Sequence, residues 1–278
     1  MEKLIGIHRK KLLPDFKFFT FEKFAEKNVF IRKNQKAETV LFQTCYVQHN
    51  EPQIGKDTLE VLEKNKIDCA CVNGLKCCGM PAWEQGDLDT LRANAKNNLD
   101  ILIPFVEKGS IVLPINPTCA MMMRREYQEL LEGEDRERAF ILAAAIKDPS
   151  EYLWSIRDED RFKTNVKNNI KGTISYHAPC HLRAQGVGFK GRDLIKKVTG
   201  SNVKTIMECC GHNGTYAMKV ESYDASIRIG KKSFDKMQSH ETEIWATDCP
   251  LAALQFKQHA GVKPKHPMSI LAEAYRNS

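Results

Sequence analysis

Short runs of consecutive apolar residues alternate along this chain with stretches in which apolar residues recur every three or four positions. The runs are typical of buried strands, and the wider spacing is typical of helices that cover a sheet. The predicted strands are residues 39–43, 67–72, 110–115, 173–176, 203–207 and 244–247. The predicted helices are residues 59–66, 87–103, 120–131, 191–198, 223–237 and 269–275, and Asp87 is expected to cap the second of them. This alternation predicts an α/β protein with parallel sheets covered by helices.

A set of four cysteines occurs twice, once in each half of the chain. The first set is Cys45, Cys77, Cys78 and Cys119, and the second set is Cys180, Cys209, Cys210 and Cys249. Corresponding members are 135, 132, 132 and 130 residues apart, which indicates an internal duplication. We therefore expect an N-terminal extension (residues 1–36), a first repeat (37–131), a helical connector (132–170) and a second repeat (171–278). The two repeats should be related by pseudo-two-fold symmetry.

Every cysteine of these sets follows a predicted strand, at the edge where open α/β sheets bind their ligands. Four converging thiolates are soft ligands that suit zinc or an iron–sulfur cluster. The glycines after the two pairs, Gly79 and Gly211, let the backbone turn so that both thiols of a pair can face one centre. We therefore predict that all eight cysteines bind metal, against the alternative that they are buried apolar thiols.

Three histidines lie beside the second set only, namely His177, His181 and His212. They are the candidate catalytic residues, because a histidine can donate to a cluster sulfur, move a proton or contact a substrate. The alternative for each one is a structural histidine that bonds the backbone. Arg183, Asn213 and Lys219 are candidate neighbours of the same site.

Two further cysteines, Cys69 and Cys71, stand outside the duplication on a predicted strand. Their spacing places them on one face of that strand. A spare ligand, a redox pair and a pair of small buried hydrophobic residues all fit this spacing, and we favour the last of these.

Residues 1–36 combine the basic segment 7–11 with five phenylalanines, at positions 16, 18, 19, 21 and 24. A short helix is expected to begin near Thr20. We expect the aromatic side chains to pack on the domain behind them. A docking surface for a partner subunit and a helix at a membrane surface are the alternatives.

The bulk composition excludes some classes of protein. No apolar run approaches the ~18 residues that cross a bilayer, and the start of the chain lacks the apolar core of a signal peptide. Ten cysteines without an export signal indicate a reducing compartment, so we expect a cytoplasmic protein. The formal charge of +7 would fall to about +3 if eight thiolates held two clusters with cores of about +2 each. We therefore expect no nucleic-acid partner, and no nucleic-acid motif is present.

The doubled cysteine arrangement resembles the cysteine-rich (CCG) domain family, to which a subunit of heterodisulfide reductase belongs. The segments that carry the resemblance are residues 4–9, 180–186, 210–215, 218–221 and 266–267. Relatives in this family include iron–sulfur subunits of dehydrogenases that act on glycerol-3-phosphate or on hydroxy acids. The resemblance implies two duplicated, Rossmann-like CCG units with one 4Fe-4S cluster in each repeat, and it leaves zinc open at one of the two sites.

The sequence departs from the family pattern in two ways. The heterodisulfide reductase version has a further cysteine three places after the last one of each set, where this chain has Met122 and Ala252. This favours four-thiolate sites over a five-thiolate, non-cubane cluster. The glycerol-3-phosphate type also carries ferredoxin-like four-cysteine runs, and their absence from this sequence predicts that a ferredoxin-like iron–sulfur protein or subunit supplies them.

The resemblance implies an iron–sulfur electron-transfer subunit of a flavin-dependent dehydrogenase complex that passes electrons to quinone or another acceptor. Its partners would be a flavoprotein dehydrogenase subunit and, as an open alternative, a membrane anchor that holds it at the inner face of the membrane. No glycine-rich dinucleotide motif, P-loop or serine–histidine–acid pattern occurs, so flavin and nicotinamide are not expected on this chain. The alternatives are a cluster-based thiol/disulfide reductase of the heterodisulfide type and a zinc-stabilised scaffold without redox function.

Overall fold

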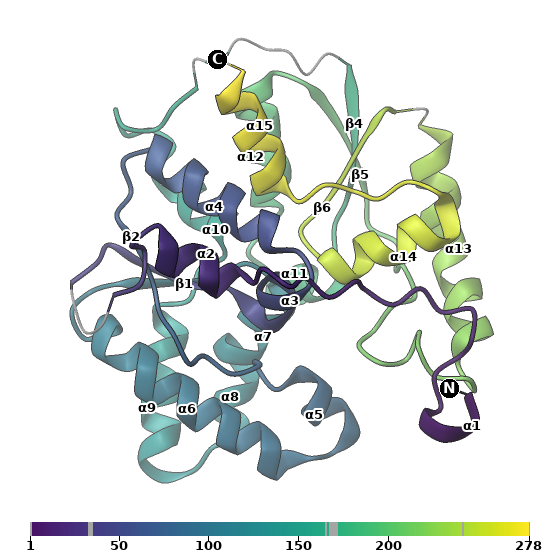
Figure 1. Ribbon diagram of the computed structural model, residues 1–278. Coiled ribbons are helices and arrows are strands. Elements are labelled where there is room, and N and C mark those ends of the chain that lie inside the picture. Colours follow the sequence, from purple (N-terminus) through teal and green to yellow (C-terminus); the bar gives the residue numbers. More distant parts are fainter. Residues whose placement is uncertain (1, 33–35, 165, 167–171, 241, 278) are drawn as a thin grey trace.

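The computed structural model describes residues 2–32, 36–164, 166, 172–240 and 242–277. Within them the chain forms two three-stranded parallel sheets (Figure 1). The first sheet consists of β1 (Thr39–Phe42), β2 (Cys69–Cys71) and β3 (Ile111–Pro114), and the second of β4 (Thr173–His177), β5 (Asn202–Ile206) and β6 (Ile244–Thr247). The strand orders are β2-β1-β3 and β5-β4-β6. In both sheets the first strand in the sequence is central, and the second and third strands lie on either side of it. The expected α/β fold with two repeated parallel-sheet units is confirmed.

The central strand of each sheet pairs with both of its neighbours. Val40 of β1 is level with Ala70 and Val112, and Tyr176 of β4 is level with Thr205 and Ala246. Because all pairs are parallel, the carboxyl ends of the three strands in a sheet lie at the same edge. The cysteines of each set come shortly after these strands in the sequence, and they therefore lie at this edge.

Helices cover both faces of the first sheet and continue into the stretch between the repeats. They are α3 (Thr44–His49), α4 (Pro52–Lys64), α5 (Met80–Gln85), α6 (Leu88–Val106), α7 (Pro117–Met121), the π-helical turn η1 (Met122–Glu126), α8 (Tyr127–Leu130), α9 (Gly133–Ala144) and α10 (Pro149–Ser155). Asp87 caps α6 as expected, because its carboxylate accepts from the Thr90 N–H at 3.1 Å. The predicted helix over 120–131 corresponds to a continuous helical stretch from Pro117 to Leu130, made of α7, η1 and α8.

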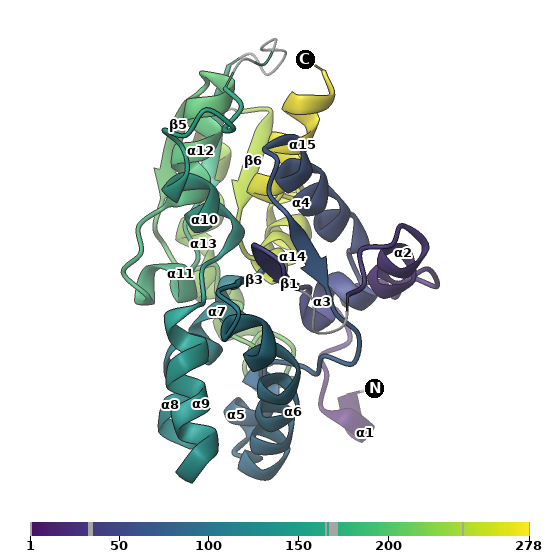
Figure 2. The same ribbon diagram turned by 90° about the vertical axis from the view of Figure 1, so that its left-hand side faces the viewer.

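The helices of the second repeat are α11 (Cys180–Ala184), α12 (Lys190–Thr199), α13 (Tyr223–Ser239), α14 (Pro250–Ala260) and α15 (Pro267–Arg276). Helices α4, α10, α12 and α15 lie together between the two sheets (Figures 1 and 2). Figure 1 shows α6 and α9 on the outer side of the first repeat, and α13 and α14 on the outer side of the second.

Alternation along β1 and β2 separates two buried layers. Leu41, Cys69 and Cys71 face a central core, whereas Val40 and Ala70 face the outer core of the first repeat. The central core also contains residues of the second repeat from β4, α12 and α15. Cys69 and Cys71 are 6% and 1% exposed, as the interpretation of small buried hydrophobic residues expects.

The N-terminal segment joins the two repeats across the front of the molecule. It runs from α1 (Glu2–Ile5), below α13 and α14, to α2 (Phe21–Lys27), beside the first repeat (Figure 1). The Thr20 hydroxyl caps α2, which confirms the predicted start of that helix. The expected packing of all five aromatic residues is wrong. Phe21 is buried and Phe24 packs partly buried against the central core, but Phe16, Phe18 and Phe19 are exposed, because they lie before α2 in a stretch without regular secondary structure.

Candidate metal centre

All eight cysteines of the two sets line one cavity of about 630 Å³. Each of them stands in the first residues after a strand or in the loop that follows it. Cys45 and Cys119 lie in the first turns of α3 and α7, Cys180 begins α11, and Cys249 precedes α14. The two pairs lie in the loops after β2 and β5. Because one cavity is shared, the two sets face each other across the boundary between the repeats.

The glycines after the pairs adopt the turn that the sequence requires. Gly79 has φ of +91° and Gly211 has φ of +75°, a region that side-chain-bearing residues rarely adopt. A Cβ on Gly211 would lie 2.0 Å from the carbonyl oxygen of Ser226 in α13, so the loop also packs closely against that helix. In each pair the second cysteine, Cys78 or Cys210, is buried, and the first is only partly covered.

Sulfur atoms within the first set contact one another. Cys45 Sγ and Cys77 Sγ are 3.9 Å apart. Hydrogen bonds from Cys45 and Cys78 lower the pKa of Cys77, and the same contact with Cys77 raises the pKa of Cys45. The Cys119 contact raises the pKa of Cys78 well above its usual range. Ionisation of one thiol in this set therefore disfavours ionisation of its neighbours.

The second set shows the same coupling and adds a cation. A hydrogen bond from Cys209, helped by Arg183, lowers the pKa of Cys180, and the pKa of Cys209 rises in return. Arg183 Nη2 donates to Cys180 Sγ at 3.3 Å, so this candidate neighbour is part of the site. Burial raises the pKa of Cys210 to about 12 and that of Cys249 to about 11.

The donor set fits a metal centre in its chemistry. Among the described residues, no three histidine, cysteine, aspartate or glutamate side chains are already arranged around a single ion. Neighbouring thiols that are at least partly buried, such as Cys77 and Cys78, are costly to ionise together, and bound metal cations supply the charge that makes four thiolates stable. Cys45, Cys77, Cys78 and Cys119 would hold one centre, and Cys180, Cys209, Cys210 and Cys249 the other.

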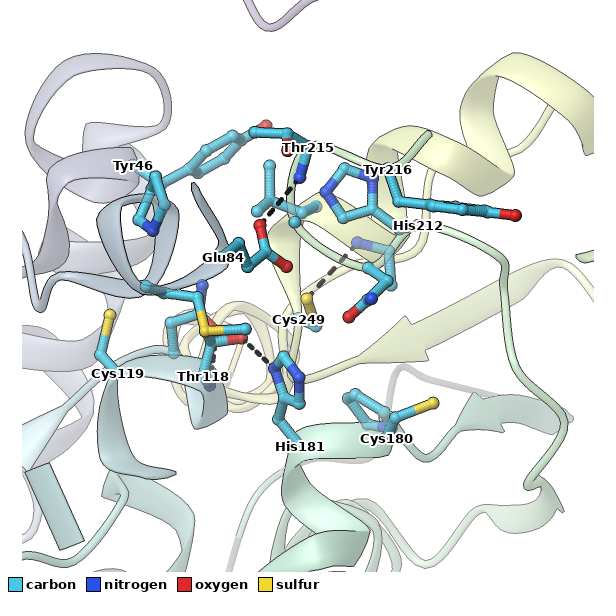
Figure 3. Close-up of a pocket in the computed structure, with 18 of the residues that line it drawn as sticks. Tyr46, Glu84, Thr118, Cys119, Cys180, His181, His212, Thr215, Tyr216 and Cys249 are labelled. Carbon is cyan, nitrogen blue, oxygen red and sulfur yellow. Dashed lines mark hydrogen bonds between the residues drawn. The ribbon is translucent and has the colours of Figure 1, made fainter. Parts of the chain in front are cut away.

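The three candidate histidines have different surroundings. His177 is fully buried, and its two ring nitrogens bond Thr247 Oγ1 and the Glu208 carbonyl, each at 3.1 Å, so its hydrogen-bonding capacity is used within the fold. His181 Nδ1 lies 2.8 Å from Thr118 Oγ1, which joins the two repeats beside Cys119. In Figure 3 this bond is dashed, and Cys119 and Cys180 lie on either side of His181.

His212 has buried ring nitrogens that find no partner in the described protein. The residue is 5% exposed and lines the cavity. Burial lowers its pKa to about 3, and the nearby Lys11 acts in the same direction, so the ring is neutral at pH 7. A neutral imidazole has one donor and one acceptor, and here both are available to a group bound in the cavity.

Glu84 forms a contact between the repeats that sequence reasoning missed. Its carboxylate accepts from the Thr215 N–H at 3.1 Å, as Figure 3 shows, and the neighbouring Gln85 Nε2 donates to Thr215 Oγ1 at 2.9 Å. The α5 helix of the first repeat therefore holds the loop that follows the second cysteine pair. No spacing in the sequence signals this contact, because the partners are 131 residues apart.

The other residues named from the sequence lie in different surroundings. Asn213 lines the cavity. Lys219 is not among the lining residues, and its backbone pairs with Ile7 of the N-terminal segment. Met122 and Ala252 are both buried, and the Ala252 N–H donates to Cys249 Sγ at 3.5 Å.

Comparison with known proteins identifies the family. The family profile of the cysteine-rich domain (CCG) matches residues 39–124 and again residues 174–257. The chain belongs to the cysteine-rich (CCG) domain family. The two matched stretches contain all eight cysteines and, apart from Thr173, the two sheets, which confirms the resemblance found from the sequence.

Several members of the CCG family are similar along much of this chain. The C subunit of anaerobic glycerol-3-phosphate dehydrogenase from Escherichia coli (strain K12) is 28% identical over 276 residues, which cover 99% of this chain and 68% of that one. Lactate utilization protein A 2 of Bacillus cereus (strain Q1) is 27% identical over 193 residues, which cover 67% of this chain and 76% of that one. Lactate utilization protein A 1 of Bacillus anthracis has the same identity and coverage.

Across the described ranges, no helix of this CCG protein combines the length and the apolar composition of a membrane span.

Proposed function

We propose that this CCG protein is an iron–sulfur electron-transfer subunit of a flavin-dependent dehydrogenase complex. The observation that carries the proposal is the convergence of all eight duplicated cysteines on one cavity. An iron–sulfur cluster, when bound, supplies one-electron transfer at a potential that the surrounding protein sets. The proposed complex oxidises glycerol-3-phosphate or a hydroxy acid, as the names of the similar proteins suggest.

The residues of the chain have separable roles in this proposal. The eight cysteines would hold one 4Fe-4S cluster in each repeat, and zinc at one site is the alternative. Arg183 would donate to a ligand sulfur, and His181 would fix the distance between the repeats through Thr118. The neutral ring of His212 would donate a hydrogen bond to the bound group. Hydrogen bonds of this kind to cluster sulfurs are one of the means by which a protein sets the reduction potential.

The proposed partners follow from the chemistry of the complex. A flavoprotein dehydrogenase subunit would deliver the electrons, and a ferredoxin-like iron–sulfur protein or subunit would extend the route. The proposed acceptor is quinone or another oxidant. The complex is proposed to be cytoplasmic, with a peripheral or anchored position at the inner face of the membrane as the alternative.

A reductive titration followed by rapid mixing tests this function. Protein purified without oxygen should bleach in the visible range on reduction, and a water-soluble quinone should then reoxidise it. Steady turnover of a disulfide in place of quinone would support the thiol/disulfide reductase alternative, for which the shared cavity leaves room between the two sets. A colourless protein that shows no bleaching would overturn the redox function and support the zinc scaffold.

A further inference from the structure

Lys11 is a buried lysine without an acidic partner. It is 7% exposed, although it stands in a basic segment whose neighbours Arg9 and Lys10 are exposed. Its ammonium group donates to Gln255 Oε1 at 2.5 Å, and no carboxylate of the described residues lies within ion-pair distance of it. A buried charge without a counter-ion is costly, so the position of Lys11 requires an explanation.

The fold forces the Lys11 side chain inward. On either side of it, Gln258 holds the backbone, because its amide donates to the Lys10 carbonyl at 2.6 Å and its oxygen accepts from the Leu12 N–H at 3.1 Å. Gln255 stands on the same face of α14 as Gln258, one turn nearer to Cys249. The ammonium group is thereby held against the helix that begins at a predicted ligand.

The network continues to the second cysteine pair. Gln255 Nε2 donates to Ser226 Oγ at 3.0 Å, and the carbonyl oxygen of Ser226 packs against Gly211, directly after Cys210. Burial lowers the pKa of Lys11 to about 8, and the charge of Cys210 acts in the opposite direction, so the two groups lie within electrostatic reach. Lys11 also lowers the pKa of His212.

The first cysteine set has no equivalent cation. In the described part of the chain, the hydrogen bonds to its sulfurs come from thiols and from the backbone N–H groups of Tyr46 and Gly79, and no lysine or arginine side chain donates to them. The second set has Arg183 on Cys180 and Lys11 behind Cys210. Four thiolates around a metal centre would supply the negative charge that Lys11 otherwise lacks.

We propose that Lys11 is the counter-ion of the second metal centre and selectively stabilises its reduced state. The inference rests on the proposed function, and Lys11 acts in it as a positioning charge that touches no substrate. Reduction adds one negative charge to a centre, and a fixed positive charge nearby in a poorly solvated interior lowers the free energy of that state. The first centre is expected to be insensitive to Lys11.

The test is a redox titration monitored by electron paramagnetic resonance on the full chain purified without oxygen. Lys11→Met removes the charge but keeps an unbranched apolar stem, Lys11→Arg keeps the charge, and Lys10→Met is the exposed control. Cys78→Ser and Cys210→Ser assign the two signals to their repeats. Iron and sulfide analysis of the wild type comes first, because their absence would refute the proposed function and the role of Lys11 with it, whereas the titration of iron-loaded protein tests the role of Lys11 alone.

Lys11→Met should disfavour reduction of the second centre about tenfold or more, a negative shift of about 59 mV for one electron. In Lys11→Arg and Lys10→Met the reduction potentials of both centres should equal those of the wild type. The potential of the first centre should stay unchanged in Lys11→Met as well. An unchanged second centre, or an equal shift of both centres, overturns the proposal. If Lys11→Met does not fold, the same titration is carried out on Gln255→Glu, because a carboxylate beside Lys11 neutralises its charge. The same selective negative shift is then expected, and no shift refutes the counter-ion role.

Discussion

Gly211 offers a quantitative test of how the loop after the second cysteine pair is built. Its φ is +75°, and a Cβ there would meet the Ser226 carbonyl oxygen at 2.0 Å. Gly261, at the end of α14, provides a matched control. Its φ is +77°, and a Cβ there would have no neighbour within 4 Å. The two glycines therefore share the backbone conformation and differ in the space around them.

The difference between the two alanine variants isolates the close approach of the loop to α13. The left-handed backbone conformation costs a non-glycine residue roughly 1–2 kcal/mol, a cost that both variants bear. Overpacking adds about 1–3 kcal/mol, and only at Gly211. We therefore expect Gly261→Ala to lower the free energy of unfolding by about 1–2 kcal/mol and Gly211→Ala by about 2–5 kcal/mol.

Urea unfolding of both variants, followed by circular dichroism without oxygen, measures these losses. The metal content of the folded variants provides a second readout, because displacement of the loop moves Cys210. Gly211→Ala should lose metal from the second set, and Gly261→Ala should keep the wild-type content. Equal destabilisation of the two variants would refute the claim that close packing of Gly211 against α13 holds the loop.

Three further predictions concern other parts of the molecule. Cys78→Ser and Cys210→Ser should each lose the metal of one repeat, whereas Cys69→Ser should keep both, and loss of metal in Cys69→Ser would contradict the ligand assignment. Glu84→Gln should weaken the bond to the Thr215 N–H and lower the free energy of unfolding by about 1–2 kcal/mol in urea unfolding. The control is the exposed Glu107→Gln, and an equal free energy of unfolding for the two variants would show that the contact between the repeats is dispensable. Burial raises the pKa of Asp148 from its ordinary value of 3.8 to about 6, so the folded state holds the carboxyl proton more tightly than the unfolded state does. The free energy of unfolding should therefore fall by up to about 3 kcal/mol as the pH rises from about 4 to 6. Asp148→Asn, which keeps a capping side chain on α10, should remove that part of the pH dependence, and an unchanged slope in urea unfolding would contradict it.

The strands and the cysteine edge could be predicted because they depend on local pattern. A short apolar run such as residues 39–43 is specific for a buried strand, and parallel pairing then brings the carboxyl ends together wherever the strands lie in the sequence. Cys45 and Cys119 reach one cavity for this reason alone. The near-constant offset between the sets predicted a duplication, and the equal strand order of the two sheets agrees with it.

The features that the sequence did not reveal depend on contacts between distant segments. Lys11 looks like any residue of a solvated basic run, and only the bonds of Gln258 to the backbone on either side of it turn its side chain inward. The bond of Glu84 to Thr215 requires the two repeats to be docked first. The exposure of Phe18 has the opposite origin, because an aromatic side chain predicts burial only where another element is available to cover it.

The metal content of the protein purified without oxygen tests the central claim most directly. The account predicts iron and acid-labile sulfide in equal amounts, roughly eight of each per chain if both repeats hold four-iron clusters. Zinc at one site would halve the iron and sulfide and leave the second centre to be assigned by the cysteine variants. A protein with zinc alone and no sulfide, or one without bound metal whose eight duplicated cysteines all react with an alkylating reagent, would contradict it.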